Sequence, residues 1–393
     1  MGPGSGLSAM EVLGPVAPSS LDDFLSQLVA GEGFVTIADH SVEIPNNFLS
    51  ILCSNNRASS WSHASIPMHP HTFTSLGPYT GLFTGLRSLH LEGIIANPKE
   101  ISLDVFQNAP ALDTVSIWGE NDCVNDLKLP WNQVIHYTMR DSECYYASNS
   151  FHFAMLPRLE NLRTCWLDCI VVDGGTPAPS PPILLPFLHT LTLSCAEPDG
   201  GVLVGLPQLM DHVILPALRT LSLRDGSLNS FKDPLLRLVE RSRCCLHDLT
   251  LCTLRSGDEQ DVLSLIKSGV LKDVQSLWIG WEFVRNSQKI WMKAFDLRLL
   301  PPLVRTPEGE DYLPSLRYFQ TNAWDKDDIL VTIAESRRSI GGRALECLVQ
   351  QDHCHDDYWT LDYSKEVRAK SEKQFRELCE RGLRLEWRGP PEV

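Results

Sequence analysis

The feature of this chain that most constrains its fold is an apolar motif that recurs along it. A template of the form Leu-x-x-Leu-x-Leu, with any apolar residue at the three fixed places, matches again and again. The intervals between the middle places of successive full copies are 26, 22, 28, 26, 30, 28 and 28 residues. Such a steady spacing indicates a structural repeat. These middle places are Leu89, Val115, Tyr137, Cys165, Leu191, Leu221, Leu249 and Leu277.

The last two apolar places of the template are separated by one residue, which is the period of a strand with one buried face. A strand this short cannot bury its apolar face alone, so successive copies are expected to stack as a parallel sheet with strands about 4.8 Å apart. The repeat therefore predicts an α/β leucine-rich-repeat solenoid, or horseshoe. The parallel sheet should line its concave side, and helices and irregular loops its convex side.

Several of the segments between the expected strands carry helical patterns. Pro234 is expected in the first turn of one helix, which begins at 232–234. A second helix is expected over 258–269, with acidic residues at its start and Gly269 as a left-handed stop. Two further helices are expected at 325–339 and 365–382, near the end of the chain.

The spacing also predicts how the chain is organised. Residues 1–19 are rich in Gly, Pro and Ser and are expected to form a flexible tail. Residues 20–393 are expected to form a single solenoid, because each repeat contacts only its neighbours. Its expected parts are N-terminal capping repeats at 20–85, regular repeats at 86–280, an insertion at 281–315, and irregular C-terminal repeats with a cap at 316–393.

Residues between and just after the apolar places should project from the concave face of the sheet. Many of them are Ser or Thr, which suit exposed strand positions and say little about a ligand. Large aromatic rings with charged neighbours have the composition of an interaction hot spot. The candidate partner-binding residues are Glu92, Trp118, His136, Arg140, Trp166, Asp168, Arg224, Asp248 and Trp278. The alternative is that loops fold over the three tryptophan rings and bury them.

The net charge of the chain restricts the class of partner, and its cysteines indicate the cellular compartment. The formal net charge of −15 repels phosphate, so nucleic acid and anionic membranes are not expected as partners, and a basic or neutral partner surface is favoured. The 12 cysteines show no disulfide-framework spacing and are expected to be reduced thiols. With neither a secretory signal nor a long apolar stretch, the sequence predicts a cytoplasmic or nuclear protein.

No motif of the sequence predicts catalysis, and neither a cofactor nor a metal is expected. The chain lacks a Walker phosphate loop, a nucleophile elbow and a His-Glu-x-x-His motif. The polar run 352–357 and the pair His69 and His71 are interpreted as solvated turns. Neighbouring residues on a short loop cannot all face one ion. Cys165 and Cys169 are interpreted as buried structural thiols, because Cys165 occupies a core place of the template.

Several phrases of the chain resemble the leucine-rich-repeat region of mushroom-type fungal F-box proteins. They are Leu86-Arg87-Ser88-Leu89-His90-Leu91, the stretch 215–223, the stretch 235–251, Phe48 to Leu52 leading to Trp61, Ala334 to Arg338, and Leu378 to Leu383. The resemblance extends from Ser20 onward. It implies a non-enzymatic subunit that captures a protein substrate for a cullin ubiquitin ligase, with the substrate on the concave face.

Such proteins begin with an F-box, a helical segment that docks a Skp-type adaptor, and no such segment is seen before Ser20. A Skp-type adaptor and cullin are therefore expected as partners only if an F-box lies upstream. A stand-alone scaffold or decoy without a ligase is the alternative. A cryptic hydrolase with a composite site is a third hypothesis, motivated only by the abundance of Ser and His.

Overall fold

The computed structural model divides into two compact units, residues 1–145 and 146–393, which are described separately. The prediction of one continuous solenoid over 20–393 stays a prediction. The structure describes residues 34–36, 53, 57–67, 70–93, 104–119, 127–140, 147–168, 170–171, 181–194, 205–224, 228–252, 258–280, 300, 303–306, 311–321, 329–339, 345–351 and 365–388.

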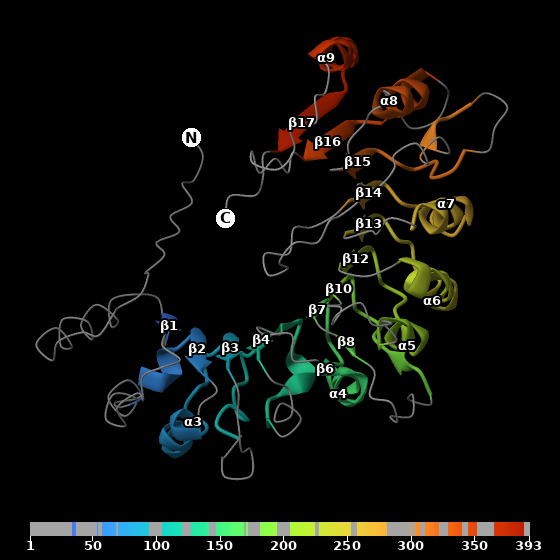
Figure 1. Ribbon diagram of the computed structural model, residues 1–393. Helices are drawn as coiled ribbons and strands as arrows, with labels where there is room; N and C mark the ends of the chain where they lie inside the picture. Colours follow the sequence, from blue (N-terminus) through green and yellow to red (C-terminus); the bar gives the residue numbers. More distant parts are fainter. Residues whose placement is uncertain are drawn as a thin grey trace, which may run out of the picture. The chain divides into compact units, whose positions relative to one another are not determined.

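In the first unit, short strands pair side by side in chain order, and every pair is parallel (Figure 1). The strands are β1 (Phe34–Thr36), β2 (His63–Pro67), β3 (Ser88–Glu92), β4 (Thr114–Trp118) and β5 (His136–Arg140). The last three of them each overlap one full copy of the apolar template.

The second unit repeats the same arrangement over a longer stretch of chain, again with parallel pairs throughout. The strands are β7 (Thr164–Leu167), β10 (Thr190–Ser194), β12 (Thr220–Arg224), β13 (Asp248–Leu251), β14 (Ser276–Ile279), β15 (Tyr318–Thr321), β16 (Cys347–Gln351) and β17 (Arg384–Arg388). Two short pairs lie beside this sheet: β6 (Ala147–Ser148) with β8 (Ile170–Val171), and β9 (Ile183–Leu184) with β11 (Val213–Ile214).

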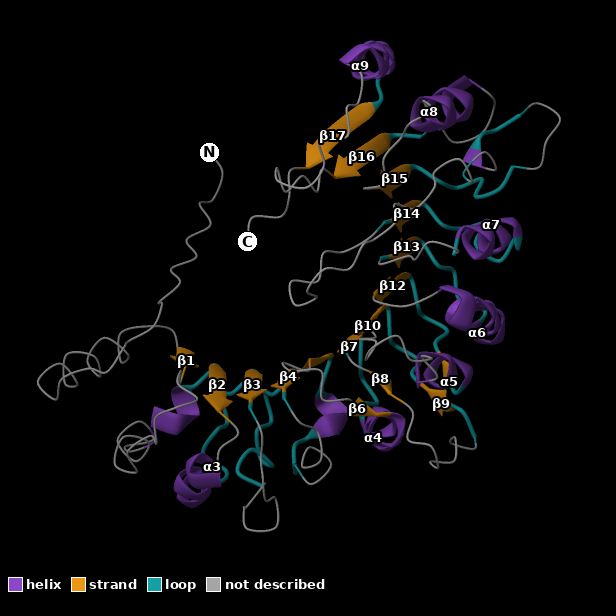
Figure 2. Cartoon of the chain, in the orientation of Figure 1, coloured by secondary structure: helices purple, strands orange, loops and turns teal. Residues whose placement is uncertain are grey.

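The segments that connect the strands differ between the units (Figure 2). In the first unit they include α3 (Pro70–Leu76) and the single-turn 3₁₀ helices η2 (Arg57–Ser60), η3 (Gly77–Tyr79) and η6 (Trp131–Gln133). In the second unit, helices run along the outer side of a curved row of strands. They are α4 (Asn149–Met155), η7 (Leu156–Arg158), α5 (Gly205–Asp211), α6 (Leu228–Ser242), α7 (Glu259–Lys267), α8 (Ile329–Ser339) and α9 (Lys365–Glu380). Each unit is thus an α/β leucine-rich-repeat solenoid.

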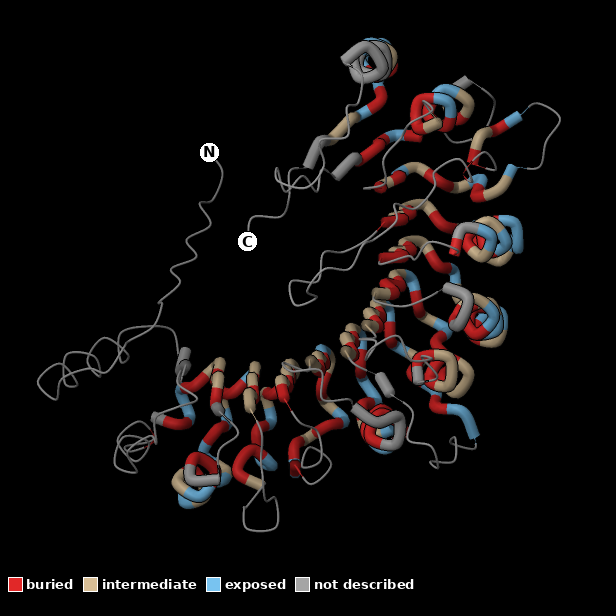
Figure 3. The backbone as a smooth tube through the Cα atoms, in the orientation of Figure 1, coloured by how far each residue is buried: buried red, intermediate tan, exposed pale blue. Residues whose placement is uncertain are grey.

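Burial follows the template closely. In β3, β4 and β10, buried and half-buried side chains alternate (Figure 3). All three apolar places are buried in every full copy, from Leu86 to Ile279, and Leu316, Phe319, Leu345 and Leu348 of the weaker copies are buried too. In the last copy Leu383 is buried, whereas Leu385 is half-buried. The predicted core is confirmed.

The predicted helix at 258–269 is confirmed by α7, and Gly269 is left-handed with φ of 72°. The helices expected at 325–339 and 365–382 correspond to α8 and α9. The expected start of a helix at 232–234 is wrong, because α6 begins at Leu228 and Pro234 lies inside it. Proline removes one backbone donor, and the two turns on either side of it are held by buried Phe231, Leu235 and Leu238.

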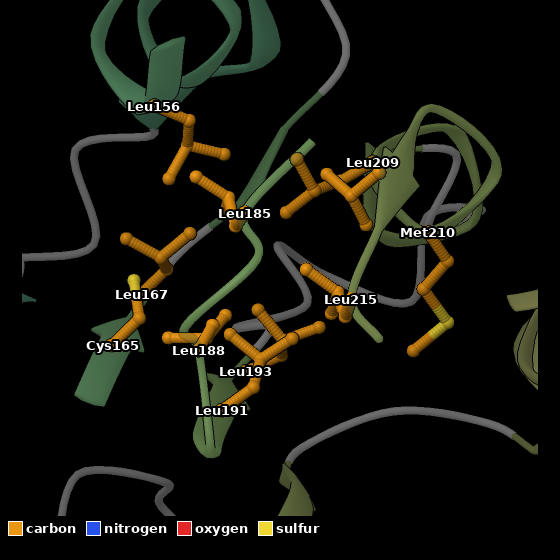
Figure 4. Close-up of a pocket in the computed structure, with 11 residues that line it drawn as sticks. Leu156, Cys165, Leu167, Leu185, Leu188, Leu191, Leu193, Leu209, Met210 and Leu215 are labelled. Atoms are coloured by element: carbon orange, nitrogen blue, oxygen red, sulfur yellow. The ribbon is translucent and has the colours of Figure 1, made fainter. Parts of the chain in front are cut away.

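A tiny void lies inside the second unit, between its sheet and helices (Figure 4). Its volume is about 10 Å³, and its lining is purely apolar, including Leu156, Leu188, Leu209 and Leu215. A space that holds at most one water and offers it no polar group is a packing defect of the core. The interior of the second unit therefore provides no ligand site here.

Candidate partner-binding face

Side chains alternate along each strand, so every second side chain points away from the core. We call this side of each sheet the open face. In the second unit it is the concave side of the curved row of strands. The open-face residues of neighbouring strands stand in register, because the parallel pairs align equivalent template positions.

On the first unit's open face, three of the predicted residues stand side by side. Strand register aligns Glu92 with Trp118 and Trp118 with Arg140. The Arg140 guanidinium carbon lies 5.3 Å from the centroid of the Trp118 ring, a cation–π geometry. The His90 ring meets the same indole edge-on at 4.9 Å. The row thus forms a half-buried aromatic cluster with a cation at one side.

Glu92 and His90 add a second charged contact to this cluster. Their Oε2 and Nε2 atoms are 3.7 Å apart. Partial burial lowers the pKa of His90, and the nearby Glu92 carboxylate opposes that effect. His136, also predicted, is exposed and lies at the opposite end of β5 from Arg140. It belongs to the open face but not to the Trp118 cluster.

On the second unit's open face, Trp166, Asp168 and Arg224 form a similar arrangement. The Trp166 indole Nε1 donates a hydrogen bond to the Asp168 carboxylate at 2.5 Å. The Arg224 guanidinium carbon lies 4.9 Å from the Trp166 ring centroid. Its Nε also donates to the Ser222 hydroxyl at 3.4 Å. Arg224 is on β12, so it reaches across β10 to cover an indole on β7.

Trp278 stands farther along the same face and lines a recess of about 220 Å³. The wall of this recess mixes polar and apolar groups. Arg384 Nε and Glu386 Oε1, 2.9 Å apart, form an ion pair within it. The recess is lined by Thr250, Ser276, Trp278, Tyr318, Phe319, Gln320, Cys347, Val349, Arg384 and Glu386.

Between Trp166 and Trp278, the same row of the open face carries small hydroxyl side chains. Strand register places Thr192, Ser222 and Thr250 in succession across β10, β12 and β13. Asp248 stands in the neighbouring row, where its carboxylate accepts a hydrogen bond from the Thr220 hydroxyl at 3.1 Å. A low polar floor therefore separates two large rings by about 19 Å, or four strand spacings.

The three tryptophan side chains are half-buried, between the exposed and covered extremes that the sequence left open. The Nε1 atoms of Trp118 and Trp278 are shielded from solvent, yet have no hydrogen-bond partner in the described part of the chain. Each is a donor that has lost its water without gaining an acceptor there. Leaving such a donor unpaired costs about 1–3 kcal/mol.

Sequence reasoning missed the part of the face formed by the last repeats. Tyr318, Gln320, Arg384 and Glu386 occupy positions equivalent to Ser276 and Trp278 on later strands. The signal that could have found them is the same alternation, applied to the weaker copies of the template around Phe319, Leu348 and Leu385.

Neither a metal centre nor a membrane span emerges from the described residues. Among them, no three His, Cys, Asp or Glu side chains gather closely enough to hold an ion. None of the described helices is long and apolar enough to cross a bilayer. Cys165 is buried, which strongly raises the pKa of its thiol. Cys169, the run 352–357 and the side chains of His69 and His71 lie outside the description.

No family model matches the chain, and no curated protein matches it. Solved structures do match, at low similarity. One is a protein from Bacteroides fragilis with 12% identity and a TM-score of 0.37, covering 94% of this chain and 81% of that one. Another is the leucine-rich repeat-containing protein LegL7 from Legionella pneumophila, with 15% identity, a TM-score of 0.41, and coverage of 81% and 98%.

A third similar structure is the complex of Rad7 and Elc1 in yeast. It shows 13% identity and a TM-score of 0.29, with coverage of 67% of this chain and 77% of the matched one. These likenesses are too distant to carry an argument about function, which has to come from the open faces themselves.

Proposed function

We propose that the protein is a non-enzymatic binding module that holds a protein partner against its open faces. The observation that carries this proposal is the set of half-buried tryptophans, two of which have a guanidinium stacked on the ring. Indole rings held in place by neighbouring side chains lose little conformational entropy on binding and are the commonest anchors of protein interfaces.

The shielded Nε1 groups of Trp118 and Trp278 support the same proposal. A partner that displaced the side chains covering them could offer each Nε1 a carbonyl or carboxylate and remove the penalty that the free protein bears. The hydroxyl floor between Trp166 and Trp278 suits a protein backbone, since Thr and Ser hydroxyls both donate and accept hydrogen bonds.

The test is affinity capture with the intact chain and with a variant carrying Trp118→Ala, Trp166→Ala and Trp278→Ala. We expect the intact chain to retain at least one protein that the triple variant loses. Leu82→Ala is the control, because Leu82 is an exposed apolar side chain of the first unit that lies outside its open face. Equal recovery by the two variants, with folding verified by circular dichroism, contradicts the assignment.

We further propose that this partner is a substrate presented to a cullin ubiquitin ligase. The resemblance of the repeat phrases to fungal F-box proteins supports this step, and one of those phrases supplies the buried Leu221 and Leu223 of β12 and the buried Leu218 just before it. Co-purification with a Skp-type adaptor and a cullin tests it. Capture of a partner without either protein would indicate a scaffold or decoy instead.

We propose a reducing compartment, the cytosol or nucleus, as its location. The described cysteines are free, and Cys53, Cys165, Cys252 and Cys347 among them are buried as small apolar side chains. Buried thiols of this kind suit compartments where glutathione keeps them reduced. A fluorescent fusion followed by microscopy tests the location, and a secreted product would contradict it.

A further inference from the structure

A row of basic residues runs along one rim of the second unit's sheet. Each member directly precedes a strand: Arg163 before β7, His189 before β10, Arg219 before β12 and His247 before β13. The backbone ties them together, since each N–H from His189 to His247 donates to the preceding member's carbonyl at 2.8–2.9 Å. We call these four residues the basic rim.

The side chains of the basic rim are available for a ligand. Arg163, His189 and Arg219 are exposed and His247 is half-buried. None of the four forms a side-chain hydrogen bond or an ion pair within the described part of the chain. By contrast, Arg237 on α6 pairs with Asp211 at 2.7 Å.

Nearby carboxylates do not neutralise the rim. Asp248 is adjacent to His247 in the chain, but its carboxylate accepts from the Thr220 hydroxyl on the open face. Farther along the same edge of the sheet, Arg317 precedes β15 and Glu346 precedes β16, and these two side chains pair with each other at 3.3 Å. Glu160 is exposed in the turn before Arg163 and forms no ion pair with it in the described structure. Although the chain has a net charge of −15, Arg163 and Arg219 have no carboxylate partner within the described residues.

An exposed aromatic ring stands beside the basic rim. Phe187 is 51% exposed and precedes His189 by two residues. Large apolar side chains with this much exposure are few among the described residues, and Leu184 at the end of β9 is another. Exposed apolar groups next to unpaired donors are a feature of protein-binding surfaces.

We propose that the basic rim binds an acidic, extended segment of a protein, with Phe187 contacting an apolar residue of that segment. The proposal rests on the proposed function, because the segment belongs to the protein partner. Carboxylates accept bidentate hydrogen bonds from Arg163 and Arg219 and single ones from the two imidazoles. The rim spans three strand spacings, about 14 Å, which about five residues of extended chain cover.

The test uses the full chain and two fluorescent peptides of about 12 residues, each with one central Leu. One peptide alternates Glu with Ser, and the other alternates Gln with Ser. We expect the Glu peptide to bind at least about tenfold more tightly at low salt, with the difference shrinking as salt screens the charges.

The double variant Arg163→Glu and Arg219→Glu should reduce affinity for the Glu peptide by about tenfold or more. The control is Lys267→Glu with Arg376→Glu, which changes the net charge equally at exposed positions on α7 and α9. Phe187→Ala should weaken both peptides by a similar factor, because it removes an apolar contact.

Equal binding of the Glu and Gln peptides would overturn the proposal, as would equal losses in the rim and control variants. A short single-stranded oligonucleotide and anionic vesicles, tested alongside, should bind no better to the intact chain than to the rim variant. Rim-dependent binding of either, in place of the peptide, would also overturn it. The proposed function fails separately, when the triple tryptophan variant captures the same proteins as the intact chain.

Discussion

The two units contain the same kind of parallel sheet, but different elements pack against its buried face. In the described part of the first unit, tight turns and rings do this work: Trp61, Phe83 and Phe106 pack in sequence with ring centroids 5.3 and 4.9 Å apart. In the second unit, helices form the layer on that face, and polar side chains of the helices hydrogen-bond to neighbouring segments. Arg241 of α6, for example, donates to the Val213 carbonyl at 2.8 Å.

Several of the buried polar groups follow from this difference. In the described part of the first unit, Thr72 is the buried polar residue. In the second, His152, Ser222, Ser242, Asp258, Arg305, Thr321 and Arg337 are buried. A helix ends with backbone groups that lack partners inside it, so a helical layer requires side chains to satisfy nearby carbonyls and amides. Ser242, which accepts from the Leu215 amide at 2.9 Å, is one of them.

The strongest test of the comparison is the replacement of Arg337 by Met. The Arg337 guanidinium donates to the carbonyls of Leu303, Tyr312 and Leu313 at 2.7–3.0 Å. Burial lowers its pKa to about 10, so it stays charged at neutral pH. Arg337→Met should lower the free energy of unfolding by about 4 kcal/mol, because three carbonyls in a largely buried site lose their donor.

Chemical denaturation measures this loss, and hydrogen exchange locates it. Protection should fall around α8 and β15 in the second unit and stay unchanged in the first. Arg376→Met on the exposed side of α9 is the matched control and should be close to neutral. A small loss for Arg337→Met would mean that the helical layer does not depend on this buried cation.

The first unit should instead be most sensitive at a glycine. Gly119 has φ of 133°, and a Cβ there would lie 2.0 Å from the carbonyl oxygen of Gly93. Gly119→Ala should therefore destabilise the first unit by about 3 kcal/mol. Gly77→Ala is the control, since nothing lies within 4 Å of its added Cβ. Similar melting temperatures for the two variants would refute the assigned role of Gly119.

Acid should weaken the helical unit through His152 of α4. This ring is fully buried, neither of its nitrogens has a partner in the described part, and burial lowers its pKa from 6.5 to about 4. The unfolded chain binds the proton more tightly, so stability falls as pH drops from about 6.5 toward about 4. The loss between pH 7 and pH 5 should be about 2 kcal/mol.

His152→Leu removes this contribution, so the comparison is made between the two proteins over that pH range. The difference in free energy of unfolding between variant and intact chain should grow in the variant's favour as pH falls. A constant difference would show that the buried ring does not titrate as inferred.

The smallest effect should come from a surface ion pair in the helical layer. Arg237 of α6 forms two hydrogen bonds to the Asp211 carboxylate of α5, at 2.7 and 2.9 Å, and is about half exposed. Asp211→Asn should cost less than about 1 kcal/mol, because water screens such pairs. Thermal unfolding measures it, and a loss as large as that for Arg337→Met would reverse the ranking of surface and buried contacts.

Much of this fold could be predicted from the sequence, because the template forces burial at fixed places. Leu191 and Leu193 had to point inward, and Trp166 and Trp278 therefore outward. The position of Pro234 inside α6 could not be predicted, because local preference places proline in a first turn. There, packing of the buried residues on either side outweighs the lost hydrogen bond.

The sequence predicted which residues lie on the candidate face, but it did not predict which of them contact one another. Sequence placed Trp166 and Arg224 on the same face, but it could not show that the guanidinium lies over that ring from two strands away. That contact depends on the rotamers of two long side chains. The roles of Arg337 and Gly119 were equally hidden, since they arise from segments that only the folded chain brings together.

The in-register pairing of neighbouring strands has a consequence for how such a protein can change over generations. A shift of one residue in any strand would exchange its inner and outer side chains and expose the apolar residues of that repeat. Substitutions at the outer positions leave that pairing intact. New partners can therefore be acquired one repeat at a time, while the residues that keep the chain folded remain untouched.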